Sequence, residues 1–223
     1  LANVCPKIQI IVEDCLDSTN TFLKQNASQF SDRDVLLVAK AQTGGRGRLG
    51  RSFCSPEGGI YMSLLLHPDM RMENAVSLTT MAAVAVAESI SQATGRETSI
   101  KWVNDVYLDD KKVCGILTEA KACVGEDRPE YVIVGVGINV TAPKDGFPSD
   151  IKDIACSIFE GENEPEGFKE ELIEDIVRRF YRYYVMSEKS DHFIKYKKLM
   201  NLLGKEVGPL RAPLFDMEEA NAA

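Results

Sequence analysis

Four glycines and three arginines alternate within residues 42–52, Gln-Thr-Gly-Gly-Arg-Gly-Arg-Leu-Gly-Arg-Ser, a segment called the Gly/Arg loop below. Glycine adopts backbone conformations that other residues avoid, and it lets the chain approach a ligand closely. Arg46, Arg48 and Arg51 each add a permanent charge and a planar fork of donors that suits carboxylates and phosphates. The loop therefore indicates a mobile segment that closes over a small anion.

Two phosphate-binding patterns also fit this loop, and both require a helix directly after it. Gly45, Gly47 and Gly50 match the dinucleotide fingerprint, and residues 45–52 match a phosphate loop with arginine in place of lysine. The residues that follow, 53–59, are typical of turns. We therefore expect arginine side chains, not a helix N-terminus, to bind the anion. A disordered Arg/Gly tract that binds RNA is the plainer alternative, and the short, single tract between apolar strands disfavours it.

Four further segments carry polar side chains, and each also has a purely structural explanation. Residues 101–105 (Lys-Trp-Val-Asn-Asp) could hold nucleotide hydroxyls or Mg²⁺ at a strand end, or simply form a turn. Lys112 either projects into a pocket or lies in water at a hairpin tip. Residues 17–20 (Asp-Ser-Thr-Asn) are ligand contacts or a helix cap. Residues 135–139 (Gly-Val-Gly-Ile-Asn) are a ligand surface or a core strand.

The composition restricts the class of protein. A chain of 223 residues is long enough for one large domain with a sizeable core. The net charge of -8 and the pI near 5.0 argue against nonspecific nucleic-acid binding, which needs a basic face. The six cysteines are scattered and the two histidines lie far apart, which argues against a zinc site. We expect reduced thiols, no signal peptide, no membrane span and a cytoplasmic protein.

Hydrophobic periodicity predicts a sheet with helices around it, of the α/β or α+β class. The expected strands cover residues 7–13, 34–41, 59–67, 99–103, 106–108, 113–121 and 130–140. The first expected helix begins after a cap at Asp17, Ser18 or Thr19 and ends near residue 26. The other expected helices cover residues 74–94, 165–187 and 191–203. Residues 141–165 are expected to form a polar connection with an apolar segment at 151–159.

The order of these motifs along the chain is more specific than any one of them. This order closely resembles that of the biotin protein ligase family. The motifs are residues 17–20, the Gly/Arg loop, residues 101–105, the run Lys-x-x-Gly-Ile-Leu that begins at Lys112, and residues 135–139. The resemblance runs from about residue 8 to residue 207, and lipoate ligases share the fold without this loop. It implies an α+β catalytic domain over residues 1–203, with a mixed β-sheet flanked by helices as in class II aminoacyl-tRNA synthetases.

The resemblance implies an enzyme, a biotin--[biotin carboxyl-carrier protein] ligase of the EC 6.3.4.15 type. Such a ligase activates biotin with ATP and Mg²⁺, giving biotinyl-5′-adenylate, and transfers biotin to a lysine of a carboxylase's biotin carboxyl carrier domain. Because the first step joins two anions, arginines and Mg²⁺ would supply the compensating charge. No nucleic acid or membrane is expected as a partner, and a homodimer is left open.

The resemblance also implies roles for individual residues. Arg46, Arg48 and Lys112 would be catalytic, the arginines over the carboxylate and phosphate and the lysine between them. The implied biotin contacts are Ser18, Thr19, Asn20, Gln42, Arg46, Gly47, Arg48, Lys112, Gly115 and Leu117. The implied nucleotide contacts are Arg48, Arg51, Phe53, Asn104, Asp105 and Asn139, and Asp105 is also the expected Mg²⁺ ligand.

Departures from the family pattern leave alternatives open. Val103 stands where the family usually has proline, and Phe53 where many members have a tryptophan that stacks on adenine. Residues 204–223 are expected to be a truncated remnant of an SH3-like C-terminal domain, and no operator-binding helix-turn-helix is expected. The alternatives are a catalytically weakened biotin- or adenylate-binding protein and a lipoate or octanoate ligase or transferase.

Overall fold

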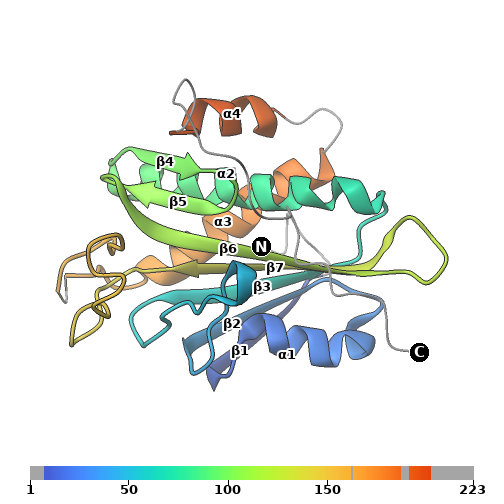
Figure 1. Cartoon of the computed structure of the whole chain (residues 1–223), viewed down its shortest axis with the longest axis horizontal. Coiled ribbons are helices and arrows are strands. Elements are labelled where there is room, and N and C mark those ends of the chain that lie inside the picture. Colours follow the sequence, from blue (N-terminus) through green and yellow to red (C-terminus); the bar gives the residue numbers. More distant parts are fainter. Residues whose placement is uncertain (1–7, 162, 187–190, 202–223) are drawn as a thin grey trace.

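The computed structural model describes residues 8–161, 163–186 and 191–201 (Figure 1). Within them, seven strands form one sheet in the order β1-β2-β3-β7-β6-β5-β4. β1 and β2 are parallel, and the other neighbouring pairs are antiparallel, so the predicted mixed sheet is confirmed. The strands are β1 (Gln9–Leu16), β2 (Val35–Gln42), β3 (Ile60–Leu66), β4 (Thr98–Lys101), β5 (Asp105–Leu108), β6 (Lys111–Ala122) and β7 (Pro129–Ile138).

Helices cover both faces of this sheet. Figure 1 shows α1 (Thr19–Asn26) on the side opposite α2 (Val76–Thr94) and α3 (Phe168–Val185), and α4 (His192–Leu199) lies over α2 and β4. α2 is rich in alanine and valine and is buried over most of its length, as its all-round apolar sequence predicts. It ends where Gly95 adopts a left-handed conformation, with φ of 69°.

The alternation of side chains along β7 divides the apolar core into two clusters. Val132, Val134 and Val136 pack with α2 and α3, whereas Tyr131 and Ile133 pack with α1. On the α1 face, the next two positions along the strand are glycines, at residues 135 and 137. The absence of side chains there leaves room above the sheet, and this is where the candidate site lies.

The predicted elements are confirmed, with shifts at their ends. The strand predicted at 7–13 is β1, which extends to Leu16 because its parallel ladder with β2 continues to the Leu16–Gln42 pair. β6 begins earlier than predicted because Asp109 and Asp110, with φ of 50° and 60°, form a two-residue hairpin turn. Ser18 is the cap of α1, accepting a hydrogen bond from the Thr21 amide.

Several predictions reach beyond the described residues. Residue 7, at the start of the first predicted strand, lies outside them, and so do residues 187, 202 and 203, at the ends of the two predicted C-terminal helices. So do the predicted domain boundary at residue 203 and the predicted remnant over 204–223. In the part of the chain that the structure describes, no helix is both long enough and apolar enough to cross a membrane.

Candidate active site

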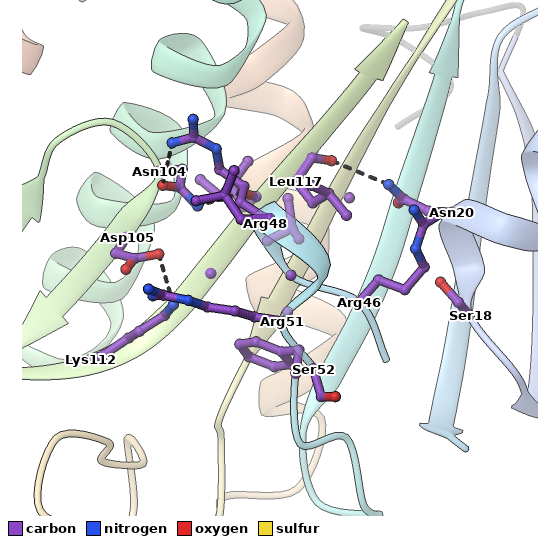
Figure 2. Close-up of a pocket in the computed structure, with 18 of the residues that line it drawn as sticks. Ser18, Asn20, Arg46, Arg48, Arg51, Ser52, Asn104, Asp105, Lys112 and Leu117 are labelled. Atoms are coloured by element: carbon purple, nitrogen blue, oxygen red, sulfur yellow. Dashed lines mark hydrogen bonds and ion pairs between the residues drawn. The ribbon is translucent and has the colours of Figure 1, made fainter. Parts of the chain in front are cut away.

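A cavity of about 300 Å³ opens on the α1 face of the sheet, between the Gly/Arg loop and strands β6 and β7 (Figure 2). The structure brings together around it nearly all of the residues predicted from the sequence. The predicted residues that line the cavity are Ser18, Thr19, Asn20, Gln42, Arg46, Gly47, Arg48, Arg51, Phe53, Asn104, Asp105, Lys112, Gly115 and Leu117.

The Gly/Arg loop folds over the cavity as a tight turn held by its own backbone. The Gly47 amide donates to the Arg51 carbonyl at 2.7 Å, and Leu49 and Gly50 adopt left-handed conformations. Its base is anchored to the start of α1, because the Gly44 amide donates to the Asp17 carbonyl at 2.8 Å. Between Arg48 and the start of β3, the chain contains one short 3-10 turn, Arg48–Gly50, and no α-helix. The prediction that no helix follows the loop directly is therefore confirmed, and the binding of an anion by the arginine side chains stays a prediction.

One end of the cavity is built from neutral polar side chains of α1 and β2. Gln42 accepts from the Thr19 amide at 2.8 Å and donates to the Ser55 hydroxyl at 2.9 Å. The Ser63 hydroxyl lies 2.7 Å from both the Thr19 hydroxyl and the side-chain oxygen Oδ1 of Asn20. Since an amide oxygen only accepts, Ser63 donates its proton to Asn20. These contacts fix the rotamers of side chains that would otherwise move freely.

A buried carboxylate, Glu119 on β6, lies behind this polar end. One of its oxygens accepts a hydrogen bond from the side-chain nitrogen Nδ2 of Asn20 at 2.7 Å, and the other pairs with the Arg46 guanidinium at 3.0 Å. The Glu119 side chain is 9% exposed, whereas that of Arg46 is 42% exposed. Figure 2 shows Arg46 extending toward Asn20, away from Arg48. The first arginine of the loop therefore serves the polar end of the cavity.

The other end of the cavity is strongly polar and mostly cationic. Arg48 donates to the Asn104 side-chain oxygen at 3.4 Å, and Asn104 in turn donates to the Ile116 carbonyl at 2.8 Å. Lys112 and Asp105 form an ion pair at 2.8 Å, with 29% and 24% of their side chains exposed. The hairpin of β5 and β6 places this pair, because its turn brings Asp105 opposite Gly115 and close to Lys112.

Glycines form the floor of the cavity beneath Phe53. Gly115 and Gly137 are cross-strand partners on β6 and β7. A Cβ atom at Gly137 would lie 2.6 Å from the Phe53 ring, and one at Gly115 would lie 3.0 Å from it. The Phe53 ring therefore lies directly on the backbone of the sheet, with the Lys112 ammonium 6.0 Å from its centroid. An aromatic face beside a cation is consistent with the predicted nucleotide contact.

Asn139 is the predicted site residue that the structure places outside the lining of the cavity. Its side-chain amide donates to the Cys156 carbonyl at 3.0 Å, and the residue is 8% exposed. The Cys156 amide donates to the Lys112 carbonyl at 2.9 Å, and the Lys112 amide donates to Ile154 at 2.8 Å. Asn139 thus holds the segment that fixes the backbone of Lys112, and its nucleotide contact stays a prediction.

Sequence reasoning did not assign several residues that build the site. Glu119 and Ser63 hold Arg46 and Asn20 in place. Gly135, which the sequence marked only as part of the segment 135–139, makes room for Asn20, since its Cβ would lie 2.2 Å from the Asn20 oxygen. The signal for Glu119 was an acid among the apolar residues of a predicted strand. The other cavity-lining residues belong to segments that the sequence singled out, without a role for each residue: Leu49, Ser52, Lys101, Trp102, Ile116, Gly135, Val136 and Gly137.

Comparisons with known proteins agree with this arrangement. A model of the biotin/lipoate A/B protein ligase family matches residues 12–139. The bifunctional ligase/repressor BirA of Bacillus spizizenii is 44% identical over 156 residues, covering 70% of this chain and 47% of that protein. The BirA protein of Escherichia coli is 31% identical over 132 residues, covering 59% of this chain and 40% of that protein. The chain thus spans less than half the length of these relatives.

Solved structures extend the similarity to the fold. The biotin protein ligase of Aquifex aeolicus in complex with biotin and ATP superposes with a TM-score of 0.69 at 34% identity, covering 88% of this chain and 80% of that one. The biotin protein ligase of Leishmania major in complex with biotinyl-5-AMP superposes with a TM-score of 0.70 at 22% identity, covering 92% of this chain and 86% of that one, which shows a shared fold.

Proposed function

The chain belongs to the biotin/lipoate A/B protein ligase family, and on this basis we propose that it is an ATP-dependent biotin protein ligase. It activates biotin as biotinyl-5′-adenylate and transfers it to a lysine of a biotin carboxyl carrier domain. The observation that carries the proposal is the convergence of Arg46, Arg48 and Lys112, from segments far apart in the sequence, on one cavity. The proposal is supported by the biotin and ATP that the Aquifex aeolicus ligase holds.

The two ends of the cavity suit the two ends of biotin. The ring of biotin is neutral and forms hydrogen bonds, which fits the end lined by Ser18, Thr19 and Gln42. Its carboxylate is an anion, which fits the end that carries Lys112 and Arg48. A cavity of about 300 Å³ is at the small end of the range for ligand sites, as a small acid requires. Leu117 then contacts the aliphatic chain between them.

The charges of the site address the difficulty of the first step. A biotin carboxylate oxygen attacks the α-phosphorus of ATP, a new C–O–P linkage forms, and the bond to pyrophosphate breaks. Both reactants are anions, so Arg48 and Lys112, at the cationic end of the cavity, lower the energy of their approach most effectively where the loop excludes water. In the second step the amine of the acceptor lysine attacks the acyl carbon, AMP leaves with the bonding electrons, and the amine loses a proton.

Mg²⁺ fits this site only as a partner of the nucleotide phosphates. The described residues contain no group of three or more acidic, histidine or cysteine side chains that could hold a metal ion alone. Mg²⁺ commonly binds through one or two carboxylates together with phosphate oxygens, and Asp105 is the carboxylate that lines the cavity. When bound, the ion neutralises phosphate charge.

The described cysteines are free, which supports a cytoplasmic location.

Labelled substrates test the proposal directly. The chain is incubated with biotin and ATP labelled at the α-phosphate, and then with a carrier domain or with the same domain lacking its acceptor lysine. Labelled biotinyl-adenylate and biotin on the intact carrier alone are expected. Biotin binding without adenylate would indicate the weakened binding protein instead. Calorimetry that gives tighter binding of lipoate than of biotin would indicate a lipoate or octanoate enzyme.

A further inference from the structure

We propose that Glu119 is a positioning residue that fixes Arg46 and Asn20 relative to one another before any ligand binds. The residue is 7% exposed and lies on β6, on the face of the sheet that carries α1. A buried carboxylate is stable only if it is paired and hydrogen-bonded. Its partners are the Arg46 guanidinium and the Asn20 amide, one on each oxygen. A single carboxylate thus links the Gly/Arg loop to the polar end of the cavity.

On the loop side, the ion pair ties Arg46 to the sheet. The backbone anchors of the Gly/Arg loop lie at its base and within its turn, whereas the Arg46 side chain reaches across to β6. The pair is half shielded from water, which strengthens it relative to an ion pair on the open surface. Without it, the loop would be held by its backbone contacts alone and would open more often.

On the α1 side, Asn20 is fully engaged. Its amide nitrogen donates to Glu119 and to the Leu117 carbonyl at 3.3 Å, and its oxygen accepts from Ser63 at 2.7 Å. The amide therefore cannot turn without breaking its contact with Glu119. Because Arg46 and Asn20 both bind the Glu119 carboxylate, a movement of one of these side chains changes the position of the other.

The arrangement leaves Arg46 able to bind a ligand. A guanidinium has five N–H donors, and Glu119 takes one of them in the contact through Nη1. A ligand that enters this end of the cavity therefore does not have to displace Glu119, and it meets an arginine that is already oriented. Glu119→Gln breaks this arrangement. Arg46 and the Asn20 side-chain nitrogen are both donors, and a glutamine amide has only one oxygen, so its NH₂ group would face one of these donors.

Limited digestion with trypsin in the absence of any ligand tests the structural part. Cleavage after Arg48 and Arg51 should be several-fold faster in both E119Q and R46Q. The double variant should be cleaved no faster than the faster single variant, because both changes remove the same contact. The matched control is E130Q, which removes the carboxylate that pairs with Lys121 of β6 on the sheet surface at 2.8 Å. Cleavage of E119Q at the wild-type rate would overturn the proposal, and if E119Q does not fold, wild-type cleavage of R46Q would do so.

The catalytic part rests on the proposed function. E119Q should raise the KM for biotin about tenfold and speed the release of adenylate, with R46Q behaving alike and the double variant no worse. The KM for ATP should change by less than about threefold, which a general loss of structure would not produce. The positioning role would be refuted if the KM for biotin of the double variant rose by the product of the two single effects. It would also be refuted by an unchanged KM for biotin in E119Q. If the wild-type chain makes no adenylate, the proposed function fails, while the digestion still decides whether Glu119 restrains the loop.

Discussion

The glycines of β7 should separate the binding of biotin from the binding of ATP. Gly135 and Gly137 lie two residues apart on the same face of the strand, one below Asn20 and the other below Phe53. An alanine at either position adds one methyl group to the floor of the cavity. Gly135→Ala places its Cβ 2.2 Å from the Asn20 oxygen, closer than atoms of real side chains approach. The Asn20 side chain must therefore leave its position.

The contacts of Asn20 set the size of the effect. Its displacement breaks hydrogen bonds to Ser63, to the Leu117 carbonyl and to the charged Glu119. At about 1 kcal/mol for a neutral hydrogen bond and about 2 kcal/mol for one to a charged group, the loss is about 3–4 kcal/mol. For a domain of this size, that lowers the Tm by about 6–16 °C. Biotin, whose ring we place at this end, should bind at least tenfold more weakly.

Gly137→Ala should act on the other ligand. Its Cβ would lie 2.6 Å from the nearest Phe53 ring atom, but Phe53 is only partly buried and can tilt into the cavity. Such overpacking costs about 1–2 kcal/mol, which lowers the Tm by about 2–8 °C. The tilted ring should raise the KM for ATP about tenfold and change biotin binding by less than about threefold.

Calorimetry with biotin, adenylate formation against ATP concentration, and thermal unfolding measure these effects. Gly125→Asn is the matched control: this glycine lies in the β6–β7 hairpin, a Cβ added to it would have no neighbouring atom within 4 Å, and asparagine tolerates its φ of 79°. Equal losses for both ligands in both alanine variants would refute the reasoning. So would a Gly135→Ala protein with the wild-type Tm.

Three further predictions concern single side chains. R46A should still form adenylate but release it early, and unchanged retention in gel filtration would contradict the role of the loop. K112Q should slow adenylate formation about 100-fold while biotin affinity, from calorimetry, falls less than tenfold; an unchanged rate would exclude Lys112 from the chemistry. Burial raises the pKa of Cys156 to about 11. Its alkylation, followed by peptide mass spectrometry, should therefore speed up about tenfold per pH unit from about pH 8 to about pH 10, and a flat profile would argue against this.

The sequence predicted the elements of the fold well because their apolar patterns are local. The apolar run in residues 131–138 and the all-round apolar sequence of 74–94 each indicate one structure without reference to the rest of the chain. The order of the strands is different, because pairing β3 with β7 depends on contacts between distant segments. Only the family resemblance implied a mixed sheet, and no local pattern indicated which strands would be neighbours.

The candidate site shows the same division. Motif order identified the side chains that line the cavity, including Lys112 and Arg48. It did not identify Glu119 or Ser63, whose importance depends on which side chains they meet across the sheet. Asn139 lies away from the cavity because the chain after β7, which has no periodic pattern, returns to the sheet and occupies its amide through Cys156. Contacts made by such irregular segments are the hardest to infer from sequence.

The glycine floor has a consequence for how this cavity can change during evolution. Where the main chain itself is the bottom of a binding site, there are no side chains left to shorten. Mutation at Gly115, Gly135 or Gly137 can therefore make the site shallower but never deeper. A descendant enzyme that accepts a bulkier acid would have to gain the space by shortening side chains that line the cavity, such as Phe53, Trp102 or Arg48. Size discrimination against larger substrates is thus secured by the backbone, whereas tolerance of new ones must be acquired in the surrounding loops.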